Sequence, residues 1–261
     1  MILDDIVTSK RREIEAAKRR LPEAELARRV AGRRAQRPFA EALRASEKQP
    51  ALIAELKRKS PSKGMLRERF DAPRLVQELQ EAGAAALSIL TDEPFFGGSL
   101  ELLQEAQAFS EVPVLRKDFI LEPYQIHEAA AAGADTILLI VRLLAPAQLS
   151  SLIAAARAYG METLVEVQDE AELERALQAS AGVIGINHRD LSDFSMHTDL
   201  SARLIPRIPR DRLVVAESGI QTRGDVERLR ALGVHALLIG ESLMTAPDPA
   251  AKVRELFQGS W

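Results

Sequence analysis

The chain has 261 residues, of which 46% are hydrophobic and 28% charged, and its formal net charge is −3 at pH 7. This length and composition suit a soluble globular chain with a sizeable buried core, folded as one large domain or two small ones. The chain has no cysteine, which excludes disulfides and thiolate metal sites, and its four histidines are scattered without ligand spacing. We therefore expect no metal and no cofactor, and the mild acidity argues against nucleic acid as the main partner.

Signals for a membrane or for export are also missing. No apolar run reaches membrane-spanning length, and the N-terminal MILDDIVTSK carries acids where a signal peptide would carry bases. We therefore expect a cytoplasmic protein that contacts no membrane. We also expect a monomer.

Residues 1–50 lack a convincing strand and are predicted to be helical. Apolar residues gather on one helical face, namely Ile2, Leu3, Ile6, Val7 and Ile14. Asp4 and Asp5 lie in the first turn, where acids suit the helix dipole. Pro22 and Pro38 divide the region into three helices.

This N-terminal region is locally basic. Between Lys10 and Arg37 there are 11 Lys and Arg residues against 4 Glu residues. One interpretation is a solvated helical face. The other is a lid that helps to attract an anionic substrate. The sequence leaves both interpretations open.

From residue 51 onward, short apolar runs alternate with segments of helical periodicity. The predicted strands are 51–56, 86–91, 112–118, 136–141, 162–167, 183–187, 213–218 and 236–241. Several of the helices between them end just before a glycine, the residue that most often follows a last helical turn: Gly83, Gly133, Gly160 and Gly233. The phrases EAGAAALSI, AAGADTILL and ALGVHALLI repeat one βα pattern.

Eight strands alternating with helices over about 210 residues predict an α/β fold, a (β/α)8 TIM barrel. We expect residues 1–261 to form this single domain, with residues 1–50 as a helical extension that packs on the barrel. The main alternative is a doubly wound open sheet. Such a sheet usually carries a glycine fingerprint after its first strand, and SPSKG is neither GxGxxG nor a Walker motif.

Polar residues stand at the ends of many predicted strands. In a barrel the carboxyl ends of the strands carry the active site. The residues are Glu55 and Lys57, Lys117, Glu166, Asn187 with Arg189, Glu217 with Ser218 and Gly219, and Gly240 with Glu241 and Ser242. A salt bridge or a cap explains any one of them alone. Together they predict ionisable groups that converge on a partly dry mouth, where they pair with each other or with a ligand.

The loops after the last two strands, ESGIQT and IGESLM, are candidates for phosphate binding. Gly219 and Gly240 let backbone N–H groups approach an anion, and Ser218 or Ser242 can donate a hydrogen bond. The alternative is that both glycines are ordinary turn residues.

The rest of the predicted rim carries a base, a loop and aromatic residues. Lys57 and the loop that begins at Ser60 can close over the same anion from the other side. Phe95, Phe96 and Phe119 follow the second and third strands, where they predict an apolar platform for a ring. Packing of these loops against the core is the alternative for the aromatic residues.

Several long stretches together resemble the indole-3-glycerol phosphate synthase family. They are IAELKRKSPSKG, ALSILTDEPFFGGSLELL, PVLRKDFILEPYQIHEAAAAGADTILLI, TLVEVQDEAELERAL, IGINHRDL, VVAESGI and LIGESLM. The resemblance runs from the N-terminal helices to the last helix and implies a barrel with an extra N-terminal helical segment. It also implies a carboxy-lyase of tryptophan biosynthesis, which closes 1-(2-carboxyphenylamino)-1-deoxyribulose 5-phosphate to indole-3-glycerol phosphate with loss of CO2 and water.

The resemblance also implies roles for the residues at the strand ends. Lys117 would be the general acid that protonates the substrate ketone, Glu55 and Lys57 would lie at the reacting centre, and Glu166 would act in the later proton transfers. The other catalytic positions are Asn187, Glu217 and Ser218. The expected substrate contacts are Ser60, Phe95, Phe119, Arg189 and Leu191. The expected phosphate contacts are Lys57, Gly219, Gly240 and Ser242.

These residue types suit the reaction independently of the resemblance. Ring closure places negative charge on a carbonyl oxygen, and a lysine supplies both a proton and a positive field there. We expect burial or a neighbouring cation to lower the pKa of Lys117 from about 10.4 toward the working pH. Two alternatives stay open: another phosphosugar barrel enzyme, either an isomerase or an aldolase with a Schiff base at Lys117, and a barrel that binds a phosphosugar without turning it over.

Overall fold

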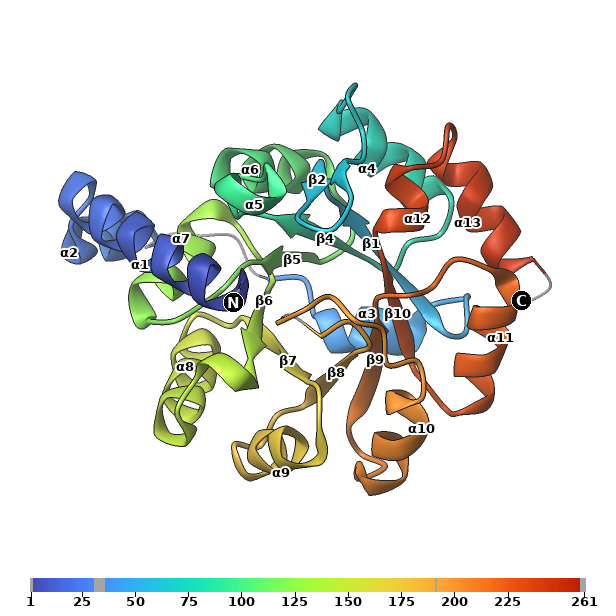
Figure 1. Cartoon of the computed structure of the whole chain (residues 1–261). Helices are drawn as coiled ribbons and strands as arrows, with labels where there is room; N and C mark the ends of the chain where they lie inside the picture. The colour runs from blue at the N-terminus through green and yellow to red at the C-terminus, as the bar shows by residue number, and fades with distance from the viewer. Residues whose placement is uncertain (1, 31–35, 191, 259–261) are drawn as a thin grey trace.

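Eight parallel strands close into a barrel, as the sequence predicts (Figure 1). The computed structural model describes residues 2–30, 36–190 and 192–258. The barrel strands are β1 (Ala51–Leu56), β4 (Ala86–Leu90), β5 (Val114–Lys117), β6 (Thr136–Ile140), β7 (Glu162–Val167), β8 (Val183–Asn187), β9 (Leu213–Glu217) and β10 (Ala236–Ile239). Their order around the ring is β1-β10-β9-β8-β7-β6-β5-β4, with β4 pairing again with β1. The open-sheet alternative is therefore wrong.

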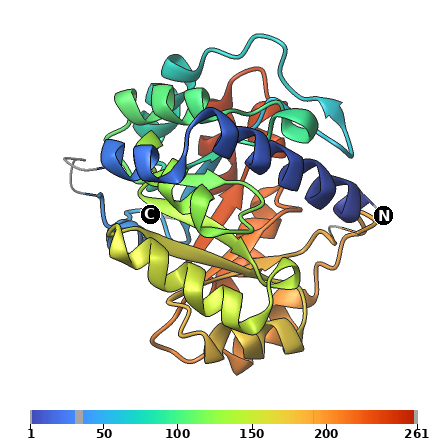
Figure 2. The same cartoon turned by 90° about the vertical axis from the view of Figure 1, so that its left-hand side faces the viewer.

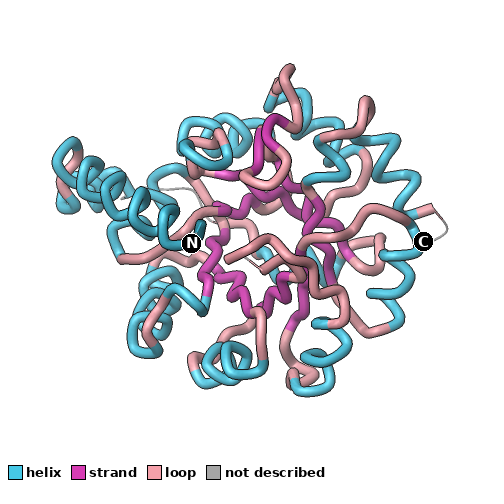
Figure 3. Tube along the Cα trace, in the orientation of Figure 1, coloured by secondary structure: helices cyan, strands magenta, loops and turns pink. Residues whose placement is uncertain are grey.

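Helices surround the ring of strands (Figure 3). They are α4 (Ala72–Glu81), α5 (Glu93–Phe96), α6 (Leu100–Phe109), α7 (Pro123–Ala132), α8 (Pro146–Ala158), α9 (Glu170–Gln178), α10 (Leu200–Leu204), α11 (Arg223–Ala231), α12 (Glu241–Met244) and α13 (Pro249–Phe257), with 3-10 turns η1 (Val141–Leu143) and η2 (Ile205–Arg207). A short hairpin, β2 (Lys59–Ser60) and β3 (Gly64–Met65), follows β1. The predicted helix-ending glycines, Gly83, Gly133, Gly160 and Gly233, all have φ between 70° and 90°, the left-handed conformation that suits this position.

The strands are buried on both faces, which explains why they are nearly continuous apolar runs in the sequence. Alternate residues of β1 illustrate the arrangement. Leu52 and Ala54 point outward into the core shared with the surrounding helices. Ala51 and Ile53 belong to a separate inner core that fills the barrel. A packed interior of this kind leaves space for a ligand only at the ends of the barrel.

The N-terminal segment forms three helices, α1 (Ile2–Arg20), α2 (Glu23–Val30) and α3 (Phe39–Ala45). Phe39 and Leu43 of α3 join the inner core beside the first residues of the strands, so α3 covers the amino-terminal end of the barrel. Helices α1 and α2 contact α7, and Figure 2 shows α1 lying along the outside of the barrel.

Most of the basic residues described on α1 face solvent, including Arg11, Arg12, Arg19 and Arg20. These four side chains form a solvated face, which one of the two interpretations predicts. Lys10 is different, because its side chain is buried. Among the described residues, no helix has the length and apolar character needed to cross a membrane.

Candidate active site

In four strands the residues that point into the barrel are apolar at first and become ionisable at the carboxyl end of the strand. In a strand every second residue points to the same face. Thus Ile53 is followed inward by Glu55, Leu115 by Lys117, Leu164 by Glu166 and Val215 by Glu217. The apolar inward-facing residues of each strand fill the barrel, and the last inward-facing residue of the strand supplies an ionisable group. The spacing of two between Glu55 and Lys57 therefore reflects the mouth of the barrel, where the apolar core ends.

A cavity lies at this end of the barrel and brings most of the predicted residues together. Its lining includes Glu55, Lys57, Ser60, Lys117, Phe119, Glu166, Asn187, Arg189, Glu217, Ser218, Gly219 and Gly240. Phe95 and Ser242 do not line it. Leu191 lies outside the described residues. The lining also contains Phe96, Phe194, Gln221 and Glu241, of which Phe96 and Glu241 were noted in the sequence at the ends of strands.

Lys117 lies at the centre of the ionisable groups. Its Nζ is 3.7 Å from Glu166 Oε2 and 3.7 Å from Glu217 Oε2. Both carboxylates are almost fully buried. Asn187 holds Glu166 from the opposite side, since its Nδ2 donates to Glu166 Oε1 at 3.0 Å while its Oδ1 accepts from the Arg189 backbone N–H at 3.1 Å.

The pKa of Lys117 is shifted in the direction opposite to the one expected from the sequence. Burial alone would lower the pKa of this lysine, but Glu166, Glu217 and Glu55 outweigh burial and raise it above its ordinary value. The expected downward shift is therefore wrong, because the sequence does not show that three carboxylates surround the ammonium. Lys117 is protonated at neutral pH, which is the state that a general acid requires.

At Glu217 the effect of burial on the pKa outweighs that of the neighbouring positive charge. Burial, and then the neighbouring charge of Glu166, raise its pKa to about 8, although Lys117 opposes the shift. Neither Glu217 oxygen accepts a hydrogen bond from the described residues, and the same is true of Glu166 Oε2. Buried acceptors without donors are rare in folded proteins, and both of these side chains line the cavity.

Glu55 and Lys57 form a close ion pair on the other side of the cavity. Lys57 Nζ lies 2.7 Å from Glu55 Oε1. Burial would raise the pKa of Glu55, but Lys57, Lys117 and Arg189 together lower it. Glu55 is therefore a carboxylate at neutral pH, in contrast to Glu217. Among the residues that the structure describes, no three or more His, Asp or Glu side chains are grouped so that they could hold a metal ion.

Two glycines leave the space that these carboxylates occupy. A Cβ on Gly185 of β8 would lie 2.3 Å from Glu217 Oε1. A Cβ on Gly240, just after β10, would lie 2.3 Å from Glu55 Oε1. Both distances are far shorter than a non-bonded contact. Gly185 was not predicted from the sequence as a site residue, since a glycine inside a strand usually signals a bulge or close backbone approach.

The predicted phosphate loops lie side by side after β9 and β10. Ser218 and Gly219 have φ of 66° and 73°, so two consecutive residues turn the backbone sharply at the cavity. Ser242 Oγ donates to the Ile220 carbonyl at 3.0 Å and thereby ties one loop to the other. Arg189 reaches the same region, where its Nη2 lies 3.1 Å from Glu241 Oε2.

The aromatic side of the cavity is built from the loops after β4 and β5. The Phe96 and Phe119 rings have centroids 6.0 Å apart and planes tilted by 38°. Both rings line the cavity, whereas Phe95 does not. Asp92 caps α5 by accepting from the Phe95 backbone N–H at 2.9 Å. The sequence could not separate Phe95 from Phe96, because one short helical turn carries both.

Comparison with known proteins agrees with the resemblance seen in the sequence. The family model described as indole-3-glycerol phosphate synthase matches residues 3–256. The indole-3-glycerol phosphate synthase of Albidiferax ferrireducens is 49% identical over 258 residues, which is 98% of each chain. That of Desulfosudis oleivorans is 46% identical over 257 residues, again 98% of each chain.

Solved structures of other proteins share the fold. A mutant tryptophan synthase alpha-subunit from Pyrococcus furiosus superposes with a TM-score of 0.61 at 18% identity, covering 80% of this chain and 98% of its own. The 3-hexulose-6-phosphate synthase of Salmonella typhimurium gives a TM-score of 0.63 at 17% identity, covering 80% and 97%. At such low identity these likenesses show the barrel fold alone.

Proposed function

The chain belongs to the indole-3-glycerol phosphate synthase family, and we propose that the side chains at its barrel mouth carry that family's reaction. The chain is accordingly a carboxy-lyase of tryptophan biosynthesis. It converts 1-(2-carboxyphenylamino)-1-deoxyribulose 5-phosphate to indole-3-glycerol phosphate, and CO2 and water are released. The substrate is a small molecule with a carboxylate, an aromatic ring and a phosphate.

Lys117 is the general acid of ring closure. As the aryl carbon that bears the carboxylate attacks the ketone carbon, the ketone oxygen takes a proton from Lys117 Nζ. The charged ammonium of Lys117 supports this role mainly through its positive field, which lies in the cavity where the ketone oxygen gains negative charge. The same observation disfavours the Schiff-base aldolase, which needs a neutral lysine as its nucleophile.

Loss of CO2 follows from the cyclised intermediate itself. When the bond to the carboxylate breaks, its electron pair restores the aromatic ring. Lys57 holds an anionic group of the substrate, and Glu55 keeps Lys57 oriented through their 2.7 Å ion pair. Dehydration then needs a base and an acid. Glu166 removes the ring proton, and Lys57 protonates the departing hydroxyl group.

Substrate binding is divided between the two sides of the cavity. The Phe96 and Phe119 rings contact the aromatic part of the substrate, with Phe95 behind them and Leu191 as a further candidate. Backbone N–H groups at Gly219 and Gly240 bind the phosphate, supported by Ser218, Ser242 and Lys57. Ser60, Asn187, Arg189 and Glu217 complete the contacts. Gly240 has a second role here, because its missing side chain leaves room for Glu55.

We also propose that the chain acts in the cytoplasm as a monomer, with residues 1–261 as one domain. Neither nucleic acid nor a membrane is needed for this reaction. The substrate is an anion, and the Lys117, Lys57 and Arg189 side chains at the cavity provide the matching positive charge.

The observation that carries this proposal is a protonated lysine 3.7 Å from each of two buried acidic side chains, all three of which line one cavity. The test adds the carboxyphenylamino-deoxyribulose phosphate to the purified chain in buffer with EDTA and follows the rise of indole fluorescence. We expect turnover without added metal or cofactor. Borohydride treatment during turnover is the control for the rival aldolase. Covalent trapping of substrate at Lys117, or consumption of substrate without indole, would contradict the proposal.

A further inference from the structure

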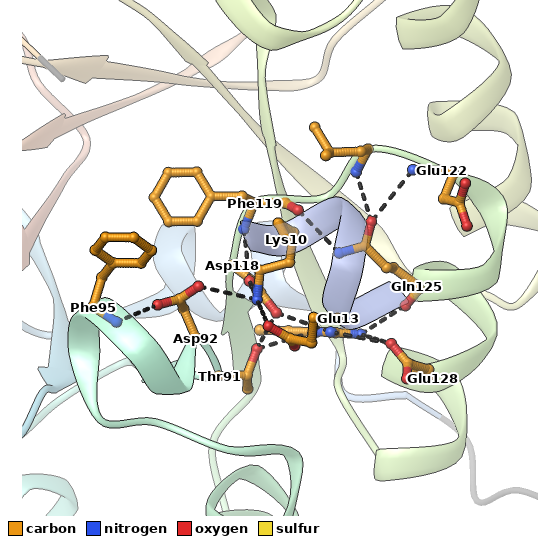
Figure 4. Close-up of polar contacts among 12 residues, drawn as sticks. Lys10, Glu13, Thr91, Asp92, Phe95, Asp118, Phe119, Glu122, Gln125 and Glu128 are labelled. Atoms are coloured by element: carbon orange, nitrogen blue, oxygen red, sulfur yellow. Dashed lines mark hydrogen bonds and ion pairs between the residues drawn. The ribbon is translucent and has the colours of Figure 1, made fainter. Parts of the chain in front are cut away.

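Lys10 of α1 is a lysine inside the protein, although α1 lies on the outside of the barrel. It continues the apolar stripe of the helix, whose buried positions are Leu3, Ile6, Lys10 and Ile14. Its Nζ lies 2.8 Å from Glu13 Oε2, 3.1 Å from Asp92 Oδ2 and 2.9 Å from Asp118 Oδ1 (Figure 4). We call Lys10, Glu13, Asp92 and Asp118 the Lys10 cluster.

The two aspartates belong to the loops that build the aromatic side of the cavity. Asp92 follows β4 and caps α5, the turn that carries Phe96. Asp118 directly follows Lys117, and its Oδ1 also accepts from the Phe119 backbone N–H at 2.8 Å. One ammonium therefore joins α1 to the backbone of both loops. Figure 4 shows Lys10 between the two aspartates, with Phe95 and Phe119 beyond them.

The two aspartates depend on Lys10 to different degrees. Asp118 Oδ2 has other partners, since Arg116 Nη2 lies 2.9 Å away and Thr91 Oγ1 donates to it at 2.6 Å. Asp92 is as deeply buried, but Lys10 is the cation that contacts it in the described part of the chain, and its Oδ2 accepts no hydrogen bond there. Without Lys10, Asp92 would be a buried carboxylate with no compensating charge, so it would have to move.

We propose that Lys10 is a positioning residue for the aromatic part of the substrate. Through Asp92 and Asp118 it sets how the Phe96 and Phe119 rings lie beside each other on the aromatic side of the cavity, although its own side chain does not line that cavity. The proposal rests on the proposed function only in assigning these rings to the substrate.

The test compares Lys10→Met with Lys10→Met/Asp92→Asn in the full chain. Methionine is an unbranched side chain one atom shorter than lysine, and it removes the charge. We expect Lys10→Met to raise KM about tenfold while kcat stays within about threefold of wild type, because the rings are displaced and the acid is not. In the double variant no carboxylate is left uncompensated at position 92, and the asparagine oxygen still accepts from Phe95. We therefore expect KM to return to about threefold above wild type.

Lys18→Met is the matched control. Lys18 is a partly exposed lysine on the same helix that pairs with Glu15 and Glu122, so its replacement should leave KM unchanged. A folded Lys10→Met variant with wild-type KM would overturn the proposal, as would a fall in kcat without a change in KM.

If Lys10→Met does not fold, the single variant Asp92→Asn tests the proposal. It keeps the cap and loses the ion pair, so a rise in KM supports the proposal and a wild-type KM overturns it.

A binding measurement separates this inference from the proposed function. Anthranilate is a fluorescent probe of the aromatic subsite that needs no turnover. Weaker anthranilate binding in Lys10→Met than in wild type supports the inference, and equal binding contradicts it. Failure of the wild-type chain to form indole is a different result, and it would count against the proposed function alone.

Discussion

Two lysines of this chain each lie among three carboxylates, yet their surroundings differ. Lys10 is 2.8 to 3.1 Å from its partners, and every contact is direct. Lys117 is 3.7 Å from Glu166 and from Glu217, and three oxygens of these two carboxylates accept no hydrogen bond in the described residues. Close pairing fixes a structure, whereas loose pairing leaves protons and acceptors available to a substrate.

One carboxyl group from each site, Asp118 and Glu217, shows opposite pKa shifts. Burial would raise the pKa of Asp118, but Arg116 and Lys10 hold it well below its usual range. Glu217 is equally buried, and burial together with Glu166 raises its pKa to about 8 in spite of Lys117. One site therefore stabilises fixed charges, and the other keeps a proton that can move near neutral pH. Perturbation alone does not mark a catalytic group.

The largest expected effect comes from removing the charge of the loosely paired lysine. We expect Lys117→Met to lower kcat about 1000-fold and to change KM by less than about fivefold, because the acid acts mainly in the transition state. Steady-state kinetics by indole fluorescence measure both values. Lys10→Met should show the opposite pattern, with its effect on KM. A Lys117→Met variant that keeps a tenth of the wild-type kcat would remove Lys117 from its proposed role.

The next effect is a change in stability with pH. The pKa of Glu217 is raised on folding, so the folded state binds a proton that the unfolded state releases between about pH 5 and pH 8. The stabilisation from this proton is complete at low pH and is lost as the pH rises through about 8. Relative to Glu217→Gln, the unfolding free energy of wild type should fall by roughly 1 kcal/mol per pH unit in this range.

Urea unfolding of wild type and Glu217→Gln at several pH values measures this difference. Asp118→Asn provides the contrast, since the pKa of Asp118 is lowered on folding. Relative to that variant, wild type should lose stability as the pH falls below about 4 and should show no slope near neutral pH. Parallel stability curves for wild type and Glu217→Gln would show that the Glu217 proton is not held as described.

A smaller effect is expected from the space beside Glu217. Gly185→Ala places a Cβ where Glu217 Oε1 lies, so the carboxylate must rotate away from Lys117 and Glu166. We expect kcat to fall about 10- to 100-fold and the pH profile of kcat to shift, because Glu217 loses its neighbours. Gly182→Ala is the matched control, since a Cβ at Gly182 meets no atom within 4 Å. An unshifted pH profile in Gly185→Ala would contradict a role for Gly185 in placing Glu217.

The barrel and most of the lining of its mouth could be predicted from the sequence because both follow a period of two. The same alternation that buries Leu115, Leu164 and Val215 carries Lys117, Glu166 and Glu217 to the end of the barrel. Regular strands therefore bring residues that are far apart in the chain to one predictable place.

The remaining features depend on contacts between different strands and loops, which the period within one segment does not predict. The pKa of Lys117 could not be predicted, because its direction depends on carboxylates from three other strands. The sequence contains one indication that Lys10 is buried, and it was not recognised from the sequence alone. Its position extends the apolar stripe of Leu3, Ile6 and Ile14, and a lysine in such a stripe indicates a buried partner. The partners themselves, Asp92 and Asp118, could be identified only from the fold.

The smallest expected effect separates the members of the Lys10 cluster. Glu13 contacts Lys10 as closely as the aspartates do, but it lies three residues away on the same helix, and its side chain is 42% exposed. A pair within one helix cannot hold that helix against the barrel, and an exposed pair contributes little to stability. We therefore expect Glu13→Gln to change the unfolding free energy by less than about 0.5 kcal/mol and to leave KM unchanged. A tenfold rise in KM would mean that total negative charge around Lys10, and not its contacts with the two loops, positions the aromatic rings.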